Sequence, residues 1–142
     1  MTYKEEKKDL FTVDFKEWTP AHCISRDCKM GAGIAVPMKK MFKLNSLINV
    51  IEKMGNVKVG ECIYYNGVFN LITKKKYWFK PNMFSMRNSL RGMLADARYH
   101  NINKIVMPKI GSGLDKLNWD SVRNEILNIF ADDDIDILVC YQ

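Results

Sequence analysis

The alternation of apolar and polar positions along the chain predicts a sheet of several strands. Apolar runs of strand length occur at 10–13, 21–24, 62–65, 68–73, 105–110 and 137–141. The runs at 105–110 and 137–141 are almost continuously apolar, which is typical of strands that are covered on both faces. Asn66 and Gly67 separate two other runs and predict a hairpin, so we expect antiparallel pairing beside parallel pairing.

Apolar residues recur at helical spacing between these runs. From 82 to 100 one stripe repeats every three or four residues, a second pattern covers 119–130, and 34–54 reads as two helical pieces. We interpret the first stripe as core filling; it consists of Met83, Met86, Leu90, Met93, Leu94 and Ala97. The order of strands and helices predicts an α/β fold, with a mixed central sheet flanked by helices on both faces.

Length and composition favour one folded domain spanning residues 1–142. Hydrophobic residues make up 47% of the chain and charged residues 27%, which is the composition of a globular protein. No apolar stretch approaches the ~20 residues of a membrane span, and the N-terminus lacks an apolar signal core, so we expect no membrane association and a cytoplasmic or nuclear location. The four cysteines and two histidines lack zinc-ligand spacing, so we expect buried reduced thiols and no metal or other cofactor.

The net charge of +6 favours an anionic partner. Nucleotides and nucleic acids both qualify, but the lysines are spread along the chain and no motif of a known nucleic-acid module is present. A generally basic surface accounts for most of these lysines.

Three polar stretches follow predicted strands, where ligands collect in open α/β sheets. The first contains Gly31, Ala32 and Gly33 at a helix start, where free NH groups and the helix dipole favour an anion. The second is a run of lysines, and the third joins two glycines to an aspartate in "IGSGLD". Neither glycine loop is a P-loop or a dinucleotide fingerprint. Together the two loops predict a clasp that holds a diphosphate from opposite sides.

The strings "AHCISRDCKMGAGIAVPMKKMF", "NLITKKKYWFKP" and "MPKIGSGLDKLNW" closely resemble the macrodomain family, specifically its terminal ADP-ribose protein glycohydrolase class. The resemblance extends over nearly the whole chain, from "KKDLF" to the final "ILVCYQ". It implies a single, monomeric macrodomain that binds ADP-ribose and acts on ADP-ribosylated protein.

The resemblance also implies roles for individual residues. Lys74, directly after "LIT", matches the catalytic lysine, and Asp115, after "GL", matches the catalytic aspartate. The remaining matches imply contacts with ADP-ribose. Asp9 and Leu10 contact the adenine, and Ser25 contacts the distal ribose. The first glycine loop holds the diphosphate and the distal ribose with Gly31, Ala32, Gly33 and Ile34, and the second loop of the clasp consists of Ile110, Gly111, Ser112, Gly113 and Leu114.

The implied reaction is the removal of mono-ADP-ribose from carboxylate side chains, with O-acyl-ADP-ribose and ADP-ribosylated nucleic acid as further substrates. A neutral amine attacks the anomeric carbon or its ring-opened aldehyde to give a covalent adduct, and Asp115 serves as a base that helps release the adduct to water. Desolvation and the positive charges of Lys75 and Lys76 favour loss of the Lys74 proton. Three alternatives stay open: a non-catalytic ADP-ribose-binding module, an ADP-ribose 1″-phosphate phosphatase and a basic nucleic-acid-binding domain.

The chain departs from the family pattern at three places. Lys8 replaces the usual glycine before Asp9, and Pro37 interrupts a helix, where it is tolerated if it lies in the first turn. The stretch "KKKYWFKP" is more aromatic and basic than in relatives. Its aromatic residues, Tyr77, Trp78 and Phe79, either rim the site or pack in the core.

Overall fold

The computed structural model describes residues 1–142 and contains one six-stranded sheet with the order β1-β6-β5-β2-β4-β3. Only β3 runs antiparallel, because a tight turn joins it to β4; every other neighbouring pair is parallel. The strands are β1 (Thr2–Lys7), β2 (Thr19–Ser25), β3 (Glu61–Tyr65), β4 (Val68–Lys74), β5 (Lys104–Met107) and β6 (Asp136–Tyr141). The mixed sheet predicted from the sequence is confirmed.

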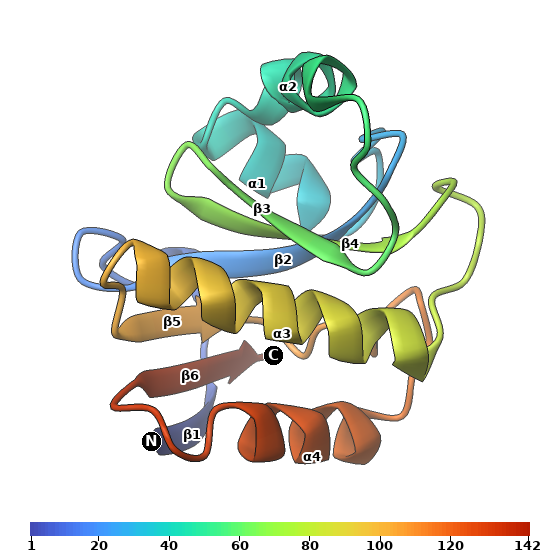
Figure 1. Cartoon of the computed structure of the whole chain (residues 1–142). Coiled ribbons are helices and arrows are strands. Elements are labelled where there is room, and N and C mark those ends of the chain that lie inside the picture. Colours follow the sequence, from blue (N-terminus) through green and yellow to red (C-terminus); the bar gives the residue numbers. More distant parts are fainter.

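Helices cover both faces of this sheet (Figure 1). They are α1 (Ala35–Met41), α2 (Leu47–Met54), α3 (Met83–Tyr99) and α4 (Trp119–Ile129). Helix α3 begins in a capping box, in which the Asn82 side chain accepts from the backbone of Ser85 and the Ser85 hydroxyl accepts in return. Pro37 is the third residue of α1, so its missing NH falls in the first turn, as the sequence predicted. No helix is both long enough and apolar enough to cross a membrane.

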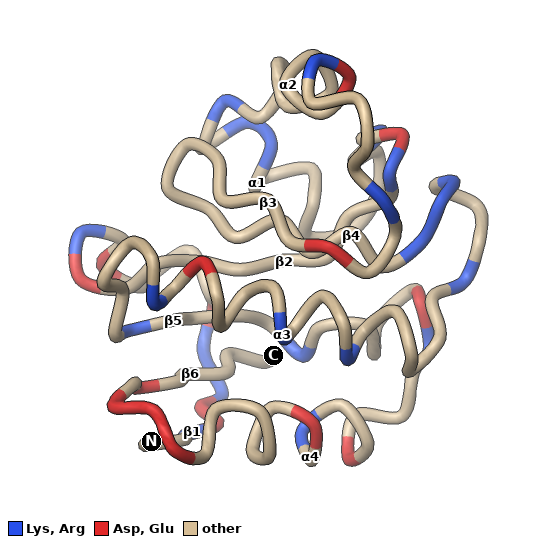
Figure 2. Tube along the Cα trace, in the orientation of Figure 1, with Lys and Arg blue, Asp and Glu red and all other residues tan.

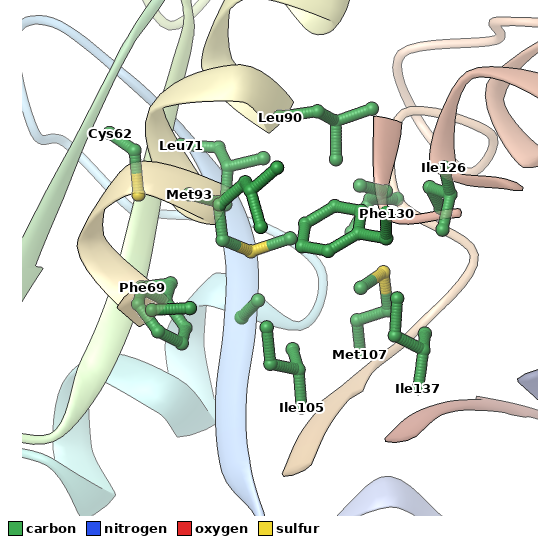
Figure 3. Packing of buried hydrophobic residues seen from close by; sticks show 14 of the residues in the cluster. Cys62, Phe69, Leu71, Leu90, Met93, Ile105, Met107, Ile126, Phe130 and Ile137 are labelled. Atoms are coloured by element: carbon green, nitrogen blue, oxygen red, sulfur yellow. The ribbon is translucent and has the colours of Figure 1, made fainter. Parts of the chain in front are cut away.

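The central strands divide their side chains between two cores. Along β6, Ile137 and Val139 face one core while Leu138 and Cys140 face the other. The first core lies against α3 and α4 and is drawn in Figure 3, where Phe130 packs among Met93, Met107 and Leu90. The second lies on the side of α1 and α2. This burial on both faces explains why these strands are apolar without interruption.

The prediction of a strand at 10–13 is wrong. These residues begin a short 3₁₀ helix, Leu10–Thr12, because the Asp9 carboxylate accepts from the Phe11 backbone NH at 3.0 Å and turns the chain. The strand lies earlier, as β1, which the apolar pattern did not indicate. Its sequence is TYKEEK, and it forms the edge of the sheet, where polar side chains remain solvated while the backbone pairs with β6.

The three aspartates at 132–134 form a turn that includes one structural residue. Both oxygens of Asp133 accept from the guanidinium of Arg98, at 2.8 and 2.7 Å. The Asp133 side chain is only 18% exposed. The acidic turn therefore ties the end of α3 to the segment before β6.

A buried histidine makes the fold sensitive to acid. His22 in β2 is fully buried, and burial lowers its pKa to about 4, although its hydrogen bond to Asn70 opposes that shift. The Asn70 amide nitrogen donates to two backbone carbonyls, so its oxygen accepts from Nε2–H of His22 at 2.6 Å. The other ring nitrogen, Nδ1, has no partner, so protonation there creates an unsatisfied charge.

We therefore expect the free energy of unfolding to fall as the pH drops from about 6.5 to about 4, by on the order of 3 kcal/mol. The sign follows because the unfolded state takes up a proton in this window and the folded state does not. Urea denaturation at several pH values measures the effect. The His22→Gln variant should lose this slope, while His100→Gln at an exposed position should keep it; equal slopes in all three proteins would contradict the assignment.

Candidate active site

The carboxyl ends of β2, β4 and β5 meet at one edge of the sheet, where a cavity of about 860 Å³ opens. Ser25, the last residue of β2, pairs with Lys74, the last residue of β4, after a shift in register that follows Ile24. The loop that follows β5 lines the same cavity with Ile110 and Gly111. The parallel arrangement of the strands thus gathers three loops that lie far apart in sequence.

Lys74 and Asp115 form an ion pair on the cavity wall. Nζ of Lys74 donates to Oδ1 of Asp115 at 2.7 Å, and each side chain is 15% exposed. The lysine is held by the end of β4, and the aspartate by the loop that joins β5 to α4. The cavity therefore holds an amine and a carboxylate within one proton transfer of each other, which is the arrangement of a nucleophile beside its base.

The two glycine loops approach each other across the cavity. Gly33 has a φ of +60°, and a Cβ at this position would stand 3.4 Å from the Leu114 side chain of the other loop. Leu114 is 63% exposed, so this contact lies at the mouth of the cavity and not in the core. The contact of the two loops at this mouth fits the predicted clasp.

Position 111 requires a glycine, because its backbone is left-handed and its neighbours leave no room for a side chain. Its φ is +75°, and an added Cβ would lie 2.8 Å from Cε of Met86 and 2.9 Å from Cδ1 of Leu117. We expect Gly111→Ala to lower the free energy of unfolding by about 2–4 kcal/mol, from the left-handed backbone and from overpacking. Gly113→Ala is the matched control, because nothing lies within 4 Å of its added Cβ and its φ is not positive. Chemical denaturation of both variants tests this; similar losses in both would contradict it.

Asp27 connects the loop after β2 to the loop after β4. One carboxylate oxygen accepts from the Ser25 hydroxyl, and the other accepts from the Tyr77 backbone NH at 3.2 Å. The Arg26 backbone NH also donates to the carbonyl of Lys74, at 2.8 Å. These bonds hold the predicted distal-ribose contact, Ser25, and the strand end that carries Lys74 in a fixed relation.

The aromatic residues of "KKKYWFKP" rim the cavity and do not pack in the core. The exposed fractions are 56% for Tyr77, 62% for Trp78 and 44% for Phe79, and all three line the cavity. The sequence left open whether these three residues rim the site or pack in the core, and the structure places them at the rim.

Most of the residues predicted for the site line this cavity. They are Ser25, Gly31, Ala32, Gly33, Ile34, Lys74, Ile110, Gly111, Gly113, Leu114 and Asp115. Three others do not: Asp9 is exposed and caps the 3₁₀ helix, Leu10 is 4% exposed within the core, and the Ser112 hydroxyl is buried without a partner. For these three residues, as for those that line the cavity, contact with ADP-ribose stays a prediction.

The cavity also contains residues that the sequence did not indicate. They are Cys23, Lys29, Met30, Ala35, Lys80, Pro108 and Lys109, together with Ile24. Burial, reinforced by the negative charge of Asp115, raises the pKa of the Cys23 thiol to about 12. Cys23 therefore stays protonated near neutral pH and is a poor nucleophile there. No group of three or more His, Cys, Asp or Glu side chains is placed to hold a metal ion.

The sequence pattern of the Macro domain family matches residues 21–126, which is well over half of the chain. The chain is a macrodomain. The match includes both glycine loops, Lys74 and Asp115, so the cavity belongs to the part of this macrodomain that the family shares.

Two relatives cover most of this macrodomain. Human ADP-ribose glycohydrolase OARD1 is 42% identical over 94% of this chain and 87% of its own length, and the bovine protein of the same name is 41% identical over the same shares. Among solved structures, the macrodomain of Thermus aquaticus DarG has a TM-score of 0.84 at 18% identity and covers 99% of each chain. Thermosipho africanus DarTG in complex with ADP-ribose has a TM-score of 0.80 at 15% identity, over 98% of this chain and 41% of that one. The macrodomain fold predicted from the sequence is confirmed.

Proposed function

We propose that this macrodomain hydrolyses the ester between mono-ADP-ribose and a carboxylate side chain, with Lys74 as the nucleophile and Asp115 as its proton partner. At the coarser level the chain is an ADP-ribosyl hydrolase, a member of the macrodomain family that is 42% identical to a protein named ADP-ribose glycohydrolase. The observation that carries the finer proposal is the ion pair of 2.7 Å on the wall of the cavity.

The pair takes part in both steps of the reaction. In the first step one proton moves from Nζ of Lys74 to Asp115, and the freed electron pair attacks the anomeric carbon of the distal ribose. The bond from that carbon to the ester oxygen breaks, and its electrons leave with the carboxylate. The second proton on the nitrogen passes to solvent, which is the proton that ester hydrolysis yields overall.

In the second step Asp115 returns its proton to the nitrogen, and the carbon–nitrogen bond breaks with its electrons going to Lys74. Water adds to the anomeric carbon and gives one proton to Asp115. The products are ADP-ribose and the free carboxylate, and the pair regains its original protons. Neither step requires a group that this chain does not supply.

The glycine loops and the basic surroundings support ADP-ribose as the bound part of the substrate. The backbone NH groups of 31–33 precede α1 and, with Lys29 and Lys109 on the cavity wall, favour a diphosphate. The structure of DarTG was solved with ADP-ribose, which agrees with this ligand for the shared fold. A cavity of about 860 Å³ is also within the range of small-molecule sites.

A non-catalytic ADP-ribose-binding module is the main alternative, since it needs the same glycine loops. It has no use for an amine paired with a carboxylate beside the distal ribose, so the Lys74–Asp115 pair disfavours it. A phosphatase acting on ADP-ribose 1″-phosphate would release inorganic phosphate, which a colorimetric assay detects.

The experiment that tests the proposal compares defined substrates. Wild-type protein is incubated with glutamate-linked, serine-linked and thymidine-linked ADP-ribose, and released ADP-ribose is quantified by chromatography. The proposal predicts release from the glutamate ester. Tight binding of ADP-ribose without release from any substrate would instead support the binding module.

A further inference from the structure

The loop at 75–81, between β4 and α3, places an apolar ridge beside the reacting pair. The ridge consists of Tyr77, Trp78 and Phe79, which are all exposed and all line the cavity that contains Lys74 and Asp115. Neither the diphosphate clasp nor the two steps of the proposed reaction use these rings. Three consecutive exposed aromatic residues are a contiguous apolar surface, which in soluble proteins marks a binding site.

The ridge is held in place by bonds to both glycine loops. The Tyr77 backbone NH donates to Asp27 in the loop after β2, and Nζ of Lys80 donates to the Leu114 carbonyl in the loop after β5, at 2.7 Å. A turn bond from the Phe79 NH to the Lys76 carbonyl, at 3.0 Å, closes the loop between them. The ridge is therefore organised before any ligand arrives, which lowers the entropy cost of binding.

We propose, on the basis of the function proposed above, that this ridge is the subsite for the polypeptide that carries the ADP-ribosylated carboxylate. The ridge begins three residues after Lys74, the residue proposed to attack the anomeric carbon. The rings and Lys74 line the same cavity, so we place the group that the ester joins to that carbon against the three rings. The rings pack on the backbone and aliphatic groups of the polypeptide.

The charges next to the ridge favour acidic neighbours around the modified carboxylate. Lys75 and Lys76 precede the rings and form no ion pair within the chain. Figure 2 shows the loop after β4 as basic before and after a stretch without charge. Lys80, after the stretch, is already bound to the Leu114 carbonyl, so Lys75 and Lys76 are the cations left for a partner.

A polypeptide fits the ridge better than a nucleic-acid strand does. The planes of Tyr77 and Trp78 meet at 86°, and those of Trp78 and Phe79 at 90°. Successive bases of a strand need ring faces that each accept a stacked base, together with a basic groove that follows the backbone. The perpendicular rings instead form one compact apolar surface, and Lys75 and Lys76 add a positive charge beside it. Such a surface suits a polypeptide with acidic side chains.

The test compares substrates that differ only beyond the anomeric carbon. The substrates are O-acetyl-ADP-ribose, a peptide with ADP-ribosyl-glutamate among acidic neighbours, the same peptide with neutral neighbours, and an ADP-ribosylated single-stranded oligonucleotide. We expect Trp78→Ala to lower the ratio of kcat/KM on the acidic peptide to that on O-acetyl-ADP-ribose about tenfold. Trp78→Phe should restore most of this ratio. Tyr99→Ala, which removes an aromatic ring that is 83% exposed at the far end of α3, should leave the ratio unchanged.

The charge part of the proposal has its own readout. The wild type should prefer the acidic peptide over the neutral one, and both added salt and Lys75→Gln should reduce that preference. An equal loss on the peptide and on O-acetyl-ADP-ribose in Trp78→Ala would overturn the proposal, because it would mean that the ring only supports the fold. A selective loss on the oligonucleotide would overturn it in favour of a nucleic-acid subsite. Absence of release from every ester would reject the proposed function itself, and the subsite with it.

Discussion

Replacement of Lys74 by alanine is expected to abolish hydrolysis of the glutamate ester, with a loss of about 10⁴-fold or more, because Lys74 is the lysine of the cavity wall that is paired with Asp115. ADP-ribose should still bind within a few-fold of the wild-type affinity, since the glycine loops that hold it are unchanged. Single-turnover release of ADP-ribose measures the first quantity, and calorimetric titration measures the second.

The Lys74→Arg variant separates nucleophilic from electrostatic roles. Arginine keeps the positive charge opposite Asp115 but stays protonated, so it cannot attack carbon. We expect this variant to be as inactive as Lys74→Ala, while Lys53→Ala, at an exposed position in α2, should hydrolyse at the wild-type rate. Substantial hydrolysis by Lys74→Arg would mean that the charge matters and the amine does not attack.

Replacement of Asp115 by alanine is expected to slow turnover by about 10²–10⁴-fold and to let a covalent adduct accumulate. Without this carboxylate, the bond between the sugar carbon and Lys74 loses the group that protonates its nitrogen and activates water. Intact-protein mass spectrometry after mixing with substrate should show a mass gain of one ADP-ribosyl group. Fragmentation of the digested protein should place this group on Lys74.

Two controls make the adduct experiment specific. The double variant Lys74→Ala/Asp115→Ala should show no mass gain, and Asp120→Ala, which removes an exposed carboxylate at the start of α4, should turn over without accumulation. An adduct found on another lysine, or a slow Asp115→Ala variant with no adduct, would contradict the second step of the mechanism.

The parts of the fold that the sequence predicted are those buried on both sides. Strands β5 and β6 alternate between two cores, so their apolar runs have no polar interruption. Helix α3 was likewise predicted within one residue at each end, because its buried stripe and its Asn82 cap coincide. Strand β1 escaped detection because an edge strand needs only backbone pairing, and its pairing partner, β6, lies at the other end of the chain.

The residues of the candidate site also fall into those that the sequence predicted and those that it did not. The glycine loops, Lys74 and Asp115 lie in continuous strings, and the parallel strands bring Lys74 and Asp115 together across 41 residues. Lys29 and Lys109 were missed, since a lysine beside a cavity has no sequence signature that separates it from a surface lysine. The role of Asp27 was also hidden, because its bond to the Tyr77 NH exists only where two loops meet.

The central claim is that the Lys74 amine and the Asp115 carboxylate act on the same sugar carbon. A crystal structure of the protein with bound ADP-ribose tests this most directly. The predicted result is the diphosphate between the two glycine loops and the anomeric carbon about 3–3.5 Å from Nζ of Lys74, with Asp115 beside it. An anomeric carbon beyond the reach of Nζ, or either side chain turned out of the cavity, would contradict the proposed mechanism.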